Sequence, residues 1–595
     1  MDRVSIIIIA ICIVLLLTWN TLVHKAYPTK PLPPGATNAP VTMVSTNGTN
    51  VTSTATLAPP TLEAAQAALV VNTNTPEELL EVTNSNAHYT FSSYGGGLKL
   101  VELLHYPETV LSRREQRSHA TNRVATLDTY SPAPTLALLD GEALHGDGVF
   151  KLSRTANGIR AEKQLTNGLS IVKDFEVGTN YLVQAAVRLE NRSDHPLALP
   201  TQDWFTGTAT PMNPQDDGSA VGVMWYNGTK TQDIGPGYFS SSGFACIPRT
   251  PPAEFRGGSS NVVWVAVHNQ FFALAVMPKQ PASEAVVRKI LLPRPNEEDI
   301  TFRTVRQPVG FTASMVYPAM TLAPHEAILR QAVIYAGPKE YRTLASISAT
   351  YNNNVDGIMG FGFFGFVSKG LLLWMNWLHS VLSLSYGWAI IAITVTIKMV
   401  FWPLTQASTR SAKRMQALQP KIKELQTKYK DDPVKQQRKM MEFWKENKIN
   451  PMSGCLPTLI QMPVFFGFFF MIRTAIELRG ASFLWVPDLS RPDTLFYLPG
   501  VNFPVNLLPL VMGVTMLWQA HLTPPSAGMD PAQAKIMRYM PLMFMVFLYN
   551  YSAGLTLYWT VQNLLSILQT KLIRMQPEPA TAPAAGLTPA PKKRK

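Results

Sequence analysis

The chain has 595 residues, too many for a single compact core, so we expect several domains. Only 15% of its residues are charged, whereas soluble domains carry about 25%, and this deficit indicates a membrane protein. The net charge is +13, and much of the excess lies in one loop and in the C-terminal tail. This uneven distribution argues against a general nucleic-acid surface, so no stable nucleic-acid complex is expected. The three cysteines form neither a disulfide framework nor a CxxC metal site.

The N-terminal region is predicted to be an anchor followed by a linker. The apolar run Val4–Trp19 has 16 residues, slightly fewer than the roughly 20 that span a bilayer comfortably. No small-x-small cleavage site follows it closely, so residues 1–26 are interpreted as an uncleaved transmembrane anchor with its N-terminus in the cytoplasm. Residues 27–84 are rich in Pro, Thr, Asn and Ala, a composition that buries no core and predicts a disordered linker.

Residues 85–345 have the pattern of an all-β domain. Short β-branched and aromatic runs, such as LSIVKDFEV and VVWVAVHNQFFALAVM, alternate with Gly, Asn, Asp and Pro turns. This alternation predicts an antiparallel β-sandwich, interrupted by one short helix at Pro338–Ser348. Because the anchor is expected to have its N-terminus inside, the β domain is expected on the outer side of the membrane.

Apolar segments return in the C-terminal part. Residues 358–385 combine aromatic residues with few charges, which favours an amphipathic helix at the membrane interface over a span. Residues 386–573 are predicted to form a core of five spans. These spans are Tyr386–Thr405, Cys455–Ile472, Val505–Leu522, Met537–Tyr551 and Ala553–Thr570. With the anchor, the prediction is a polytopic α-helical membrane protein of six spans that carries the β domain.

The charges of the loops predict the orientation. The loop Arg410–Lys448 has twelve Lys or Arg against five Asp or Glu, a net +7. A short loop this basic stays in the cytoplasm, and so should the tail 574–595, which ends in PKKRK. The loop Arg473–Asp493 has three basic and three acidic residues, which fits the outside. Coiled-coil spacing within 406–450 predicts a cytoplasmic helical hairpin, which either sets the topology or binds ribosomal RNA or anionic lipid.

Lys398 is the only charged residue of the predicted span Tyr386–Thr405. A lysine at the centre of a span costs about 2.5–3.5 kcal/mol on insertion scales, and an intramembrane charge is therefore a candidate functional site. Lys398 also lies roughly 10 Å from Thr405 along a helix, so its side chain could instead snorkel to the cytoplasmic headgroups. The cost of burial alone leaves both interpretations open.

Other polar residues could line a water-filled groove with Lys398. Thr394 lies one helical turn before it, and Gln461 and Gln519 lie in the third and fourth spans. The five spans of the core contain no carboxylate, so Lys398 is free to attract an acidic group of another molecule. A proton-coupled transporter would typically contain an intramembrane acid. A solute transporter or channel is the first alternative function, and a membrane-tethered sugar-binding or sugar-modifying protein acting through 85–345 is the second.

Several stretches resemble the YidC-type membrane protein insertases. They are KMVFWPLT, QPKIKELQ, NPMSGCLPTLIQMPVFFGFF and MPLMFMVFLYNYSAGLTLYWTVQNLLSILQ. The likeness covers about Ile358–Arg574, and the anchor with its large β domain is similar to the form found in bacteria with two membranes. It implies an inner-membrane protein whose β domain is a periplasmic supersandwich, similar to sugar-mutarotase folds. It also implies an insertase and chaperone, not a covalent enzyme, that needs no cofactor or metal.

The resemblance further implies partners and residue roles. The partners are nascent membrane proteins, membrane lipids, the Sec translocon and, weakly or transiently, the ribosome. A positive residue in a groove open to the cytoplasm receives acidic or polar parts of the substrate. The family usually has arginine there and this chain has Lys398, which keeps the charge and loses the bidentate fork. The implied groove residues are Lys398, Thr394, Gln461, Gln519, Tyr558 and Trp559. The implied slide for substrate helices, on the third and fifth spans, is Phe465, Phe469, Met540 and Met543.

Overall fold

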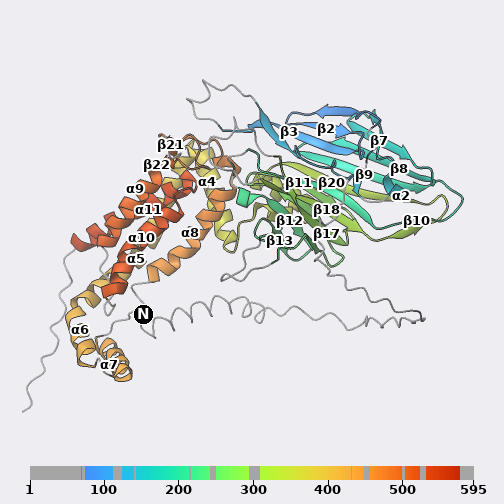
Figure 1. Ribbon diagram of the computed structural model, residues 1–595. Coiled ribbons are helices and arrows are strands. Elements are labelled where there is room, and N and C mark those ends of the chain that lie inside the picture. Colours follow the sequence, from blue (N-terminus) through green and yellow to red (C-terminus); the bar gives the residue numbers. More distant parts are fainter. Residues whose placement is uncertain are drawn as a thin grey trace, which may run out of the picture. The chain divides into compact units, whose positions relative to one another are not determined.

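The computed structural model describes residues 69, 71, 74–110, 123–139, 142–213, 216, 218–240, 250–293, 308–429, 432–447, 456–498, 503–522 and 531–575. The predicted anchor 1–26, most of the linker 27–84 and nearly all of the tail 574–595 lie outside these residues. The described part of the chain consists of an antiparallel β domain followed by a helical part (Figure 1).

The β domain is built from two large sheets and two smaller ones. The largest sheet has the order β13 (Thr231–Ile234), β12 (Gly222–Tyr226), β15 (Trp264–His268), β16 (Phe272–Pro278), β20 (Ala327–Pro338), β9 (Leu182–Asn191), β8 (Leu169–Val177), β7 (Gly158–Gln164) and β6 (Lys151–Arg154). The second has the order β14 (Glu254–Gly257), β17 (Glu284–Leu291), β18 (Val309–Tyr317), β11 (Gln202–Ala209) and β5 (Leu138–Leu139). The smaller sheets are β1 (Leu79–Thr83), β2 (Ala87–Ser92), β3 (Gly97–Pro107) and β4 (Val124–Leu127), and the pair β10 (Leu197–Leu199) and β19 (Met320–Leu322). Two short helical turns are α2 (Glu142–His145) and η2 (Gly218–Ala220).

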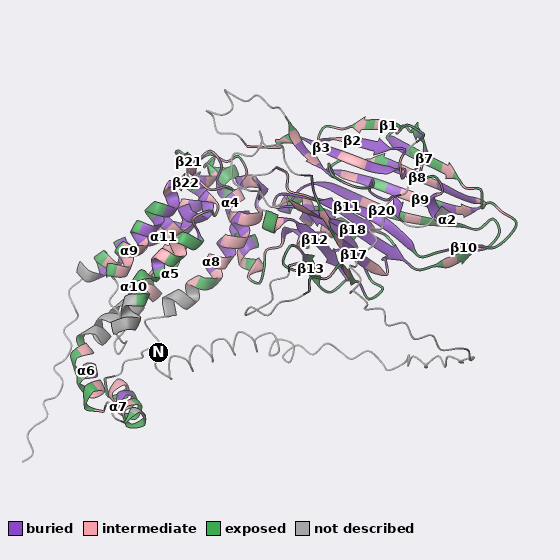
Figure 2. Cartoon of the chain, in the orientation of Figure 1, coloured by how far each residue is buried: buried purple, intermediate pink, exposed green. Residues whose placement is uncertain are grey.

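The burial of the strands explains their sequences. In β9 every second side chain is buried, as expected for a strand with one face on the core. By contrast, β11, β15 and β16 are buried almost throughout, because the second sheet packs against the largest one at these strands (Figure 2). The antiparallel sandwich expected from the alternating runs is therefore present. Its first strand begins at Leu79, earlier than the expected boundary at residue 85, because β1 pairs with β2 along its whole length.

Asp128 is a buried carboxyl group that follows β4. Its Oδ1 accepts a hydrogen bond of 2.6 Å from the backbone N–H of Thr208, and its Oδ2 accepts one of 3.5 Å from the Thr135 hydroxyl. Burial raises the pKa of Asp128 to about 8, against the hydrogen bonds that lower it. The folded chain therefore keeps a proton that the unfolded chain releases above about pH 4, the ordinary pKa of aspartate. The contribution of this group to stability is present at low pH and is lost as the pH rises towards 8.

We expect Asp128→Asn to remove this pH dependence. Asparagine keeps an oxygen for the Thr208 N–H, and it tolerates the left-handed backbone at this position, where φ is 66°. Asparagine does not ionise, so folding of the variant is not linked to proton binding at this position. The variant should therefore gain stability relative to the wild type as the pH rises from about 5 to about 8. The measurement is the thermal unfolding midpoint of both proteins in detergent at several pH values. A difference that does not change with pH would contradict the prediction.

The C-terminal part is helical. Its elements are α3 (Tyr341–Tyr351), η5 (Val355–Met359), α4 (Gly365–Leu382), α5 (Tyr386–Ala417), α6 (Gln419–Lys428), α7 (Pro433–Glu446), α8 (Leu456–Thr474), η7 (Ile476–Leu478), α9 (Leu507–Leu522), α10 (Pro531–Phe547) and α11 (Ala553–Met575). A helix overlaps each of the five expected spans, and α5, α9 and α11 each share one expected boundary. The exception in position is α10, which begins earlier because Pro531 is favourable in the first turn of a helix. The short helix expected at Pro338–Ser348 is α3, which begins after β20 has ended.

Length and hydropathy do not single out any one described helix as able to cross a membrane. Among the described residues only a pair of consecutive helices, Gly365–Leu382 with Tyr386–Val400, satisfies both criteria together, and the chain bends by 118° between them. α9 is a shorter apolar helix. The count of six spans therefore stays a prediction.

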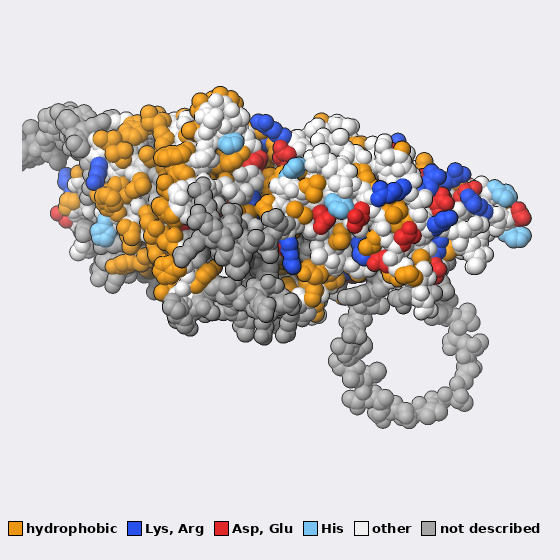
Figure 3. Space-filling view, turned by 90° about the horizontal axis from the view of Figure 1, so that it is seen from above, with side chains coloured by type: hydrophobic (Ala, Val, Ile, Leu, Met, Phe, Trp, Pro, Cys, Tyr) orange, Lys and Arg blue, Asp and Glu red, His pale blue; other side chains and the backbone are white. Residues whose placement is uncertain are grey.

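The exposed side chains differ between the two parts. Large apolar side chains are exposed on the helices, for example Phe366 of α4 (78%), Val400 of α5 (68%) and Val546 of α10 (70%). In the space-filling view, hydrophobic side chains form a broad area over the helical part, whereas charged side chains are scattered over the β domain (Figure 3). An exposed apolar surface of this extent is typical of a protein that meets lipid or an apolar partner.

The basic segment 406–450 forms helices where the structure describes it. α5 continues past its expected end at Thr405, and α6 restarts with Pro420 in its first turn. Asp432 caps α7 by accepting a hydrogen bond of 3.0 Å from a backbone N–H of the first turn. The Gln436 amide of α7 donates to the Gln426 carbonyl of α6 at 2.9 Å, so these two helices fold back on each other as a hairpin.

The segment between α8 and α9 contains a β-hairpin that was not expected. It consists of β21 (Thr494–Leu498) and β22 (Phe503–Asn506), which pair in antiparallel fashion. The expected span began at Val505, within β22. The runs LFYL and FPV on either side of Pro-Gly are the signal that could have revealed the hairpin.

All three arginines of the predicted outer loop Arg473–Asp493 contact the β domain. Arg473 donates to the Ser219 hydroxyl at 2.9 Å. Arg479 donates to a backbone carbonyl after β3 at 2.9 Å, and its guanidinium lies 5.3 Å from the centroid of the Phe272 ring. Arg491 forms an ion pair of 2.6 Å with Asp216.

Candidate functional site

Lys398 lies in α5 with its side chain directed at α11. Its ammonium donates a hydrogen bond of 2.8 Å to the Ser566 hydroxyl. The side chain is half-buried, and no carboxylate of the described residues forms an ion pair with it. An ammonium has three N–H donors, so two are left for other acceptors once Ser566 has taken one.

One face of α11 beside Lys398 is polar. Gln562, Ser566 and Gln569 are four and three residues apart, which places them on the same side of the helix. The Oε1 of Gln562 and the Nε2 of Gln569 are buried and have no hydrogen-bond partner among the described residues. A buried polar atom without a partner costs roughly 1–3 kcal/mol. These two atoms therefore mark a place where a polar group or water from outside the chain would be favourable.

Two of the expected groove residues, Gln461 and Tyr558, are in contact. The Gln461 amide of α8 donates to the Tyr558 hydroxyl of α11 at 3.1 Å. The Tyr558 ring stacks on Phe468 with their centroids 4.1 Å apart, and the side chain is only 2% exposed. This pair joins α8 to α11 inside the bundle, so Tyr558 presents no surface to a groove in this conformation.

The two expected slide residues of α8, Phe465 and Phe469, make aromatic contacts at and just before α11. Trp559 lies edge-on to Phe465 of α8, with 4.7 Å between the ring centroids, and is 5.9 Å from Phe544 of α10. Phe469 packs against Tyr551 at 5.8 Å. Phe465 and Phe469 are half-buried. Phe465 therefore packs on Trp559 of α11 and Phe469 on Tyr551 just before α11, and each of these two phenylalanines keeps part of its surface exposed.

Met540 and Met543 of α10 are exposed, by 38% and 64%. Methionine is flexible and polarisable, so an exposed pair can adapt to apolar partners of different shape. Lipid-facing packing explains their exposure equally well.

The remaining expected groove residues are Thr394 of α5 and Gln519 of α9. Thr394 is only 1% exposed, and its hydroxyl donates to the Ile390 carbonyl one turn earlier at 2.7 Å. Gln519 is half-buried near the end of α9. A hydrogen bond of 3.3 Å from the Asn563 amide of α11 to the Thr515 hydroxyl of α9 joins these two helices.

Ser566 is one residue of this site that the sequence did not single out. It lies in the apolar stretch LLSILQ, where a lone serine carries little information. The signal that could have found it is the spacing of Gln562, Ser566 and Gln569, which repeats with the helical period.

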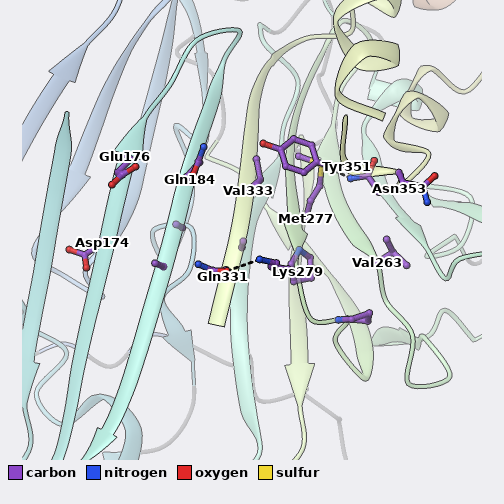
Figure 4. Close-up of a pocket in the computed structure, with 16 residues that line it drawn as sticks. Asp174, Glu176, Gln184, Val263, Met277, Lys279, Gln331, Val333, Tyr351 and Asn353 are labelled. Carbon is purple, nitrogen blue, oxygen red and sulfur yellow. Dashed lines mark hydrogen bonds between the residues drawn. The ribbon is translucent and has the colours of Figure 1, made fainter. Parts of the chain in front are cut away.

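The β domain contains a separate open pocket of about 560 Å³. It lies over the largest sheet, and its polar lining includes side chains from β8, β9, β20 and the segment after β16 (Figure 4). Lys279 donates to Gln331 across it at 3.2 Å. The Asp174 carboxylate on its rim is held by Arg160, with 2.6 Å from Nε to Oδ1. The pocket offers hydrogen-bond donors and acceptors to a polar ligand.

Family models match the chain in two consecutive regions. The model described as the YidC periplasmic domain matches residues 79–374, and the model described as the 60Kd inner membrane protein matches residues 377–579. The junction between them falls within α4.

Curated proteins and a solved structure are also similar to this chain. The membrane protein insertase YidC of Janthinobacterium sp. (strain Marseille) is 29% identical over 522 residues, which are 83% of this chain and 84% of that protein. The membrane protein insertase YidC of Nitrosococcus oceani is 32% identical over 414 residues, 69% of this chain and 68% of that protein. A crystal structure of an active YidC insertase with its first transmembrane domain resolved covers 85% of this chain and 94% of its own, at 18% identity and a TM-score of 0.34.

The TM-score of the solved structure is too low to support a conclusion about the fold, so the family is shown by the sequence matches alone. The two models together match nearly all of the chain after residue 78, and the Nitrosococcus oceani protein matches over two thirds of both lengths. This chain therefore belongs to the YidC family of membrane protein insertases, in the form that carries a periplasmic domain.

Proposed function

We propose that this chain inserts membrane proteins by receiving acidic or polar parts of the substrate at Lys398. The observation that carries the proposal is a half-buried ammonium between α5 and α11 that no carboxylate of the described residues neutralises. A charge in such a place is costly, and it is retained where it has a function. The negative group that it lacks within the chain would be supplied by the substrate.

The proposed step is electrostatic and makes or breaks no covalent bond. A substrate segment that must cross the membrane carries carboxylates or other polar groups, and their transfer into hydrocarbon is unfavourable. An ammonium in a water-filled groove lowers this cost by charge attraction, and it does so without a fixed bidentate geometry. The buried Oε1 of Gln562 and Nε2 of Gln569, which have no hydrogen-bond partner among the described residues, make the same face of α11 polar.

The apolar part of the substrate would leave along the helices beside the groove. The half-buried Phe465 and Phe469 of α8 and the exposed Met540 and Met543 of α10 form the proposed slide. Aromatic rings and flexible thioether side chains can pack against substrate helices of many different apolar sequences. Gln461, Tyr558 and Trp559 would hold α8 against α11 at the side of the groove, and Thr394 and Gln519 would complete its polar lining.

The chain is proposed to lie in the bacterial inner membrane with the β domain in the periplasm and both termini in the cytoplasm. The contacts of Arg473, Arg479 and Arg491 with the β domain support this orientation, because they place the predicted outer loop beside a predicted outer domain. The angle of 118° between α4 and the first part of α5 supports an interfacial position for α4 if α5 crosses the membrane. The hairpin of α6 and α7 then lies in the cytoplasm. There the chain would contact nascent chains, the Sec translocon and the ribosome.

Site-directed crosslinking tests this function. A photoreactive residue is placed at Lys398, Thr394 or Phe469, and a nascent single-span protein with an acidic translocated end is synthesised in the presence of membranes. We expect substrate crosslinks from Phe469 and, with a lower yield because the ammonium is lost, from position 398, whereas Thr394, which is only 1% exposed, should crosslink only if the groove opens around it. Leu329, an exposed residue on β20 of the β domain, is the control position and should give none. The absence of crosslinks from all three positions of the helical part would reject the groove.

A further inference from the structure

The Ser566 hydroxyl is arranged to accept a hydrogen bond from a cation. Its own hydrogen is donated to the Gln562 carbonyl one turn earlier, at 2.8 Å. A hydroxyl has one donor and two acceptor lone pairs, so this bond turns the free lone pairs away from the helix axis. The Lys398 ammonium lies at one of them, 2.8 Å away.

This contact provides a constraint that lysine lacks by itself. The ammonium is a point charge on a flexible four-carbon stem, whereas a guanidinium is a planar fork that binds two acceptors in a fixed geometry. A lysine in a wet groove can also bend towards the headgroups. The hydrogen bond to Ser566 holds the ammonium of Lys398 at α11 and so opposes its movement towards the headgroups.

We infer that Ser566 is a positioning residue for the charge that receives the substrate. It holds the Lys398 ammonium at the face of α11, so that the two remaining N–H groups are presented to a carboxylate of the incoming segment. Gln569 lies three residues later on the same face of α11 and is 2% exposed, and its Nε2 has no hydrogen-bond partner among the described residues. The inference rests on the proposed role of Lys398.

The test compares two single-span substrates in proteoliposomes that contain the purified full-length chain. One substrate has an acidic translocated tail, and in the other the acids are replaced by their amides. Insertion is measured by protection of the tail from protease. The variants are Ser566→Ala, Ser566→Thr, Lys398→Ala, Lys398→Arg and the double variant Lys398→Arg/Ser566→Ala. The matched control is Thr570→Ala, because the Thr570 hydroxyl makes the same kind of bond, 2.8 Å to the carbonyl one turn earlier.

Loss of the positioning bond should lower insertion of the acidic tail about threefold to tenfold in Ser566→Ala, the usual effect of one net hydrogen bond. Insertion of the amide tail should be unchanged. Ser566→Thr keeps the hydroxyl and should insert both tails normally, as should Thr570→Ala. When position 398 is arginine, Ser566→Ala should lower insertion of the acidic tail by less than about twofold. The planar guanidinium has a fixed arrangement of donors and needs the serine less.

Two results would overturn the inference. One is an equal loss for both tails in Ser566→Ala, and the other is the same loss with lysine and with arginine at position 398. Either would mean that Ser566 only stabilises the fold. Normal insertion of the acidic tail by Lys398→Ala would instead reject the role of Lys398, and the inference about Ser566 with it. The arms of the experiment thus distinguish the two failures.

Discussion

Replacing Lys398 with glutamate should abolish insertion of substrates that have an acidic translocated segment. Alanine at this position should reduce it roughly tenfold or more, since a hydrogen bond to a charged group contributes roughly 1.5–3 kcal/mol. Glutamate should be worse than alanine, because it puts a like charge in the path of the substrate. Arginine should preserve insertion, since the charge is kept.

The measurement is insertion in cells depleted of the wild-type protein, with each variant expressed at the same level. A substrate with an uncharged translocated segment serves as the internal comparison and should respond far less. Lys428→Ala, which removes an exposed lysine of α6, is the matched control for loss of one positive charge. If the arginine, alanine and glutamate variants all insert the acidic substrate equally well, Lys398 merely snorkels to the headgroups and the proposed site is wrong.

The sequence predicted those features that depend on neighbouring residues. α5 begins at Tyr386 and α11 at Ala553, where the apolar runs start, and the strands follow the alternation of β-branched and polar residues. The hairpin β21–β22 was missed because its apolar residues merge with the apolar start of α9. A strand and a buried helix cannot be told apart by periodicity in so short a run.

The geometry of the site could not be predicted because it depends on pairs of distant residues. The sequence shows that Lys398 is a charge in an apolar segment, but its acceptor lies 168 positions away at Ser566. Likewise Tyr558 could be identified as a polar aromatic residue of the last helix. Only packing shows that its ring stacks on Phe468 and that its hydroxyl is bound by Gln461. Residue type indicates the chemistry of a side chain, whereas its partner and exposure are set by the tertiary fold.

The ion pair of Arg491 with Asp216 gives the second large prediction. Its atoms are 2.6 Å apart, and the two side chains are only 19% and 11% exposed. Removing one partner of a fully buried pair costs roughly 3–5 kcal/mol, whereas an exposed pair contributes about 0–1 kcal/mol. We expect Arg491→Ala to fall between these limits, and Asp216→Arg to be more harmful because it brings two cations together.

The double variant Asp216→Arg/Arg491→Asp should recover much of the lost stability, since it restores the pair with its charges exchanged. Thermal unfolding of the full-length chain in detergent measures the effect, and Arg438→Ala is the control, because its pair with Glu442 on α7 is 80% and 41% exposed. Recovery in the double variant requires that residue 216 of the β domain and residue 491 of the outer loop touch in the folded protein. Additive losses from the two changes would show that they do not. Because the two residues belong to segments on either side of α3 to α8, a positive result would also place the β domain and this loop on one side of the membrane, independently of any loop charge.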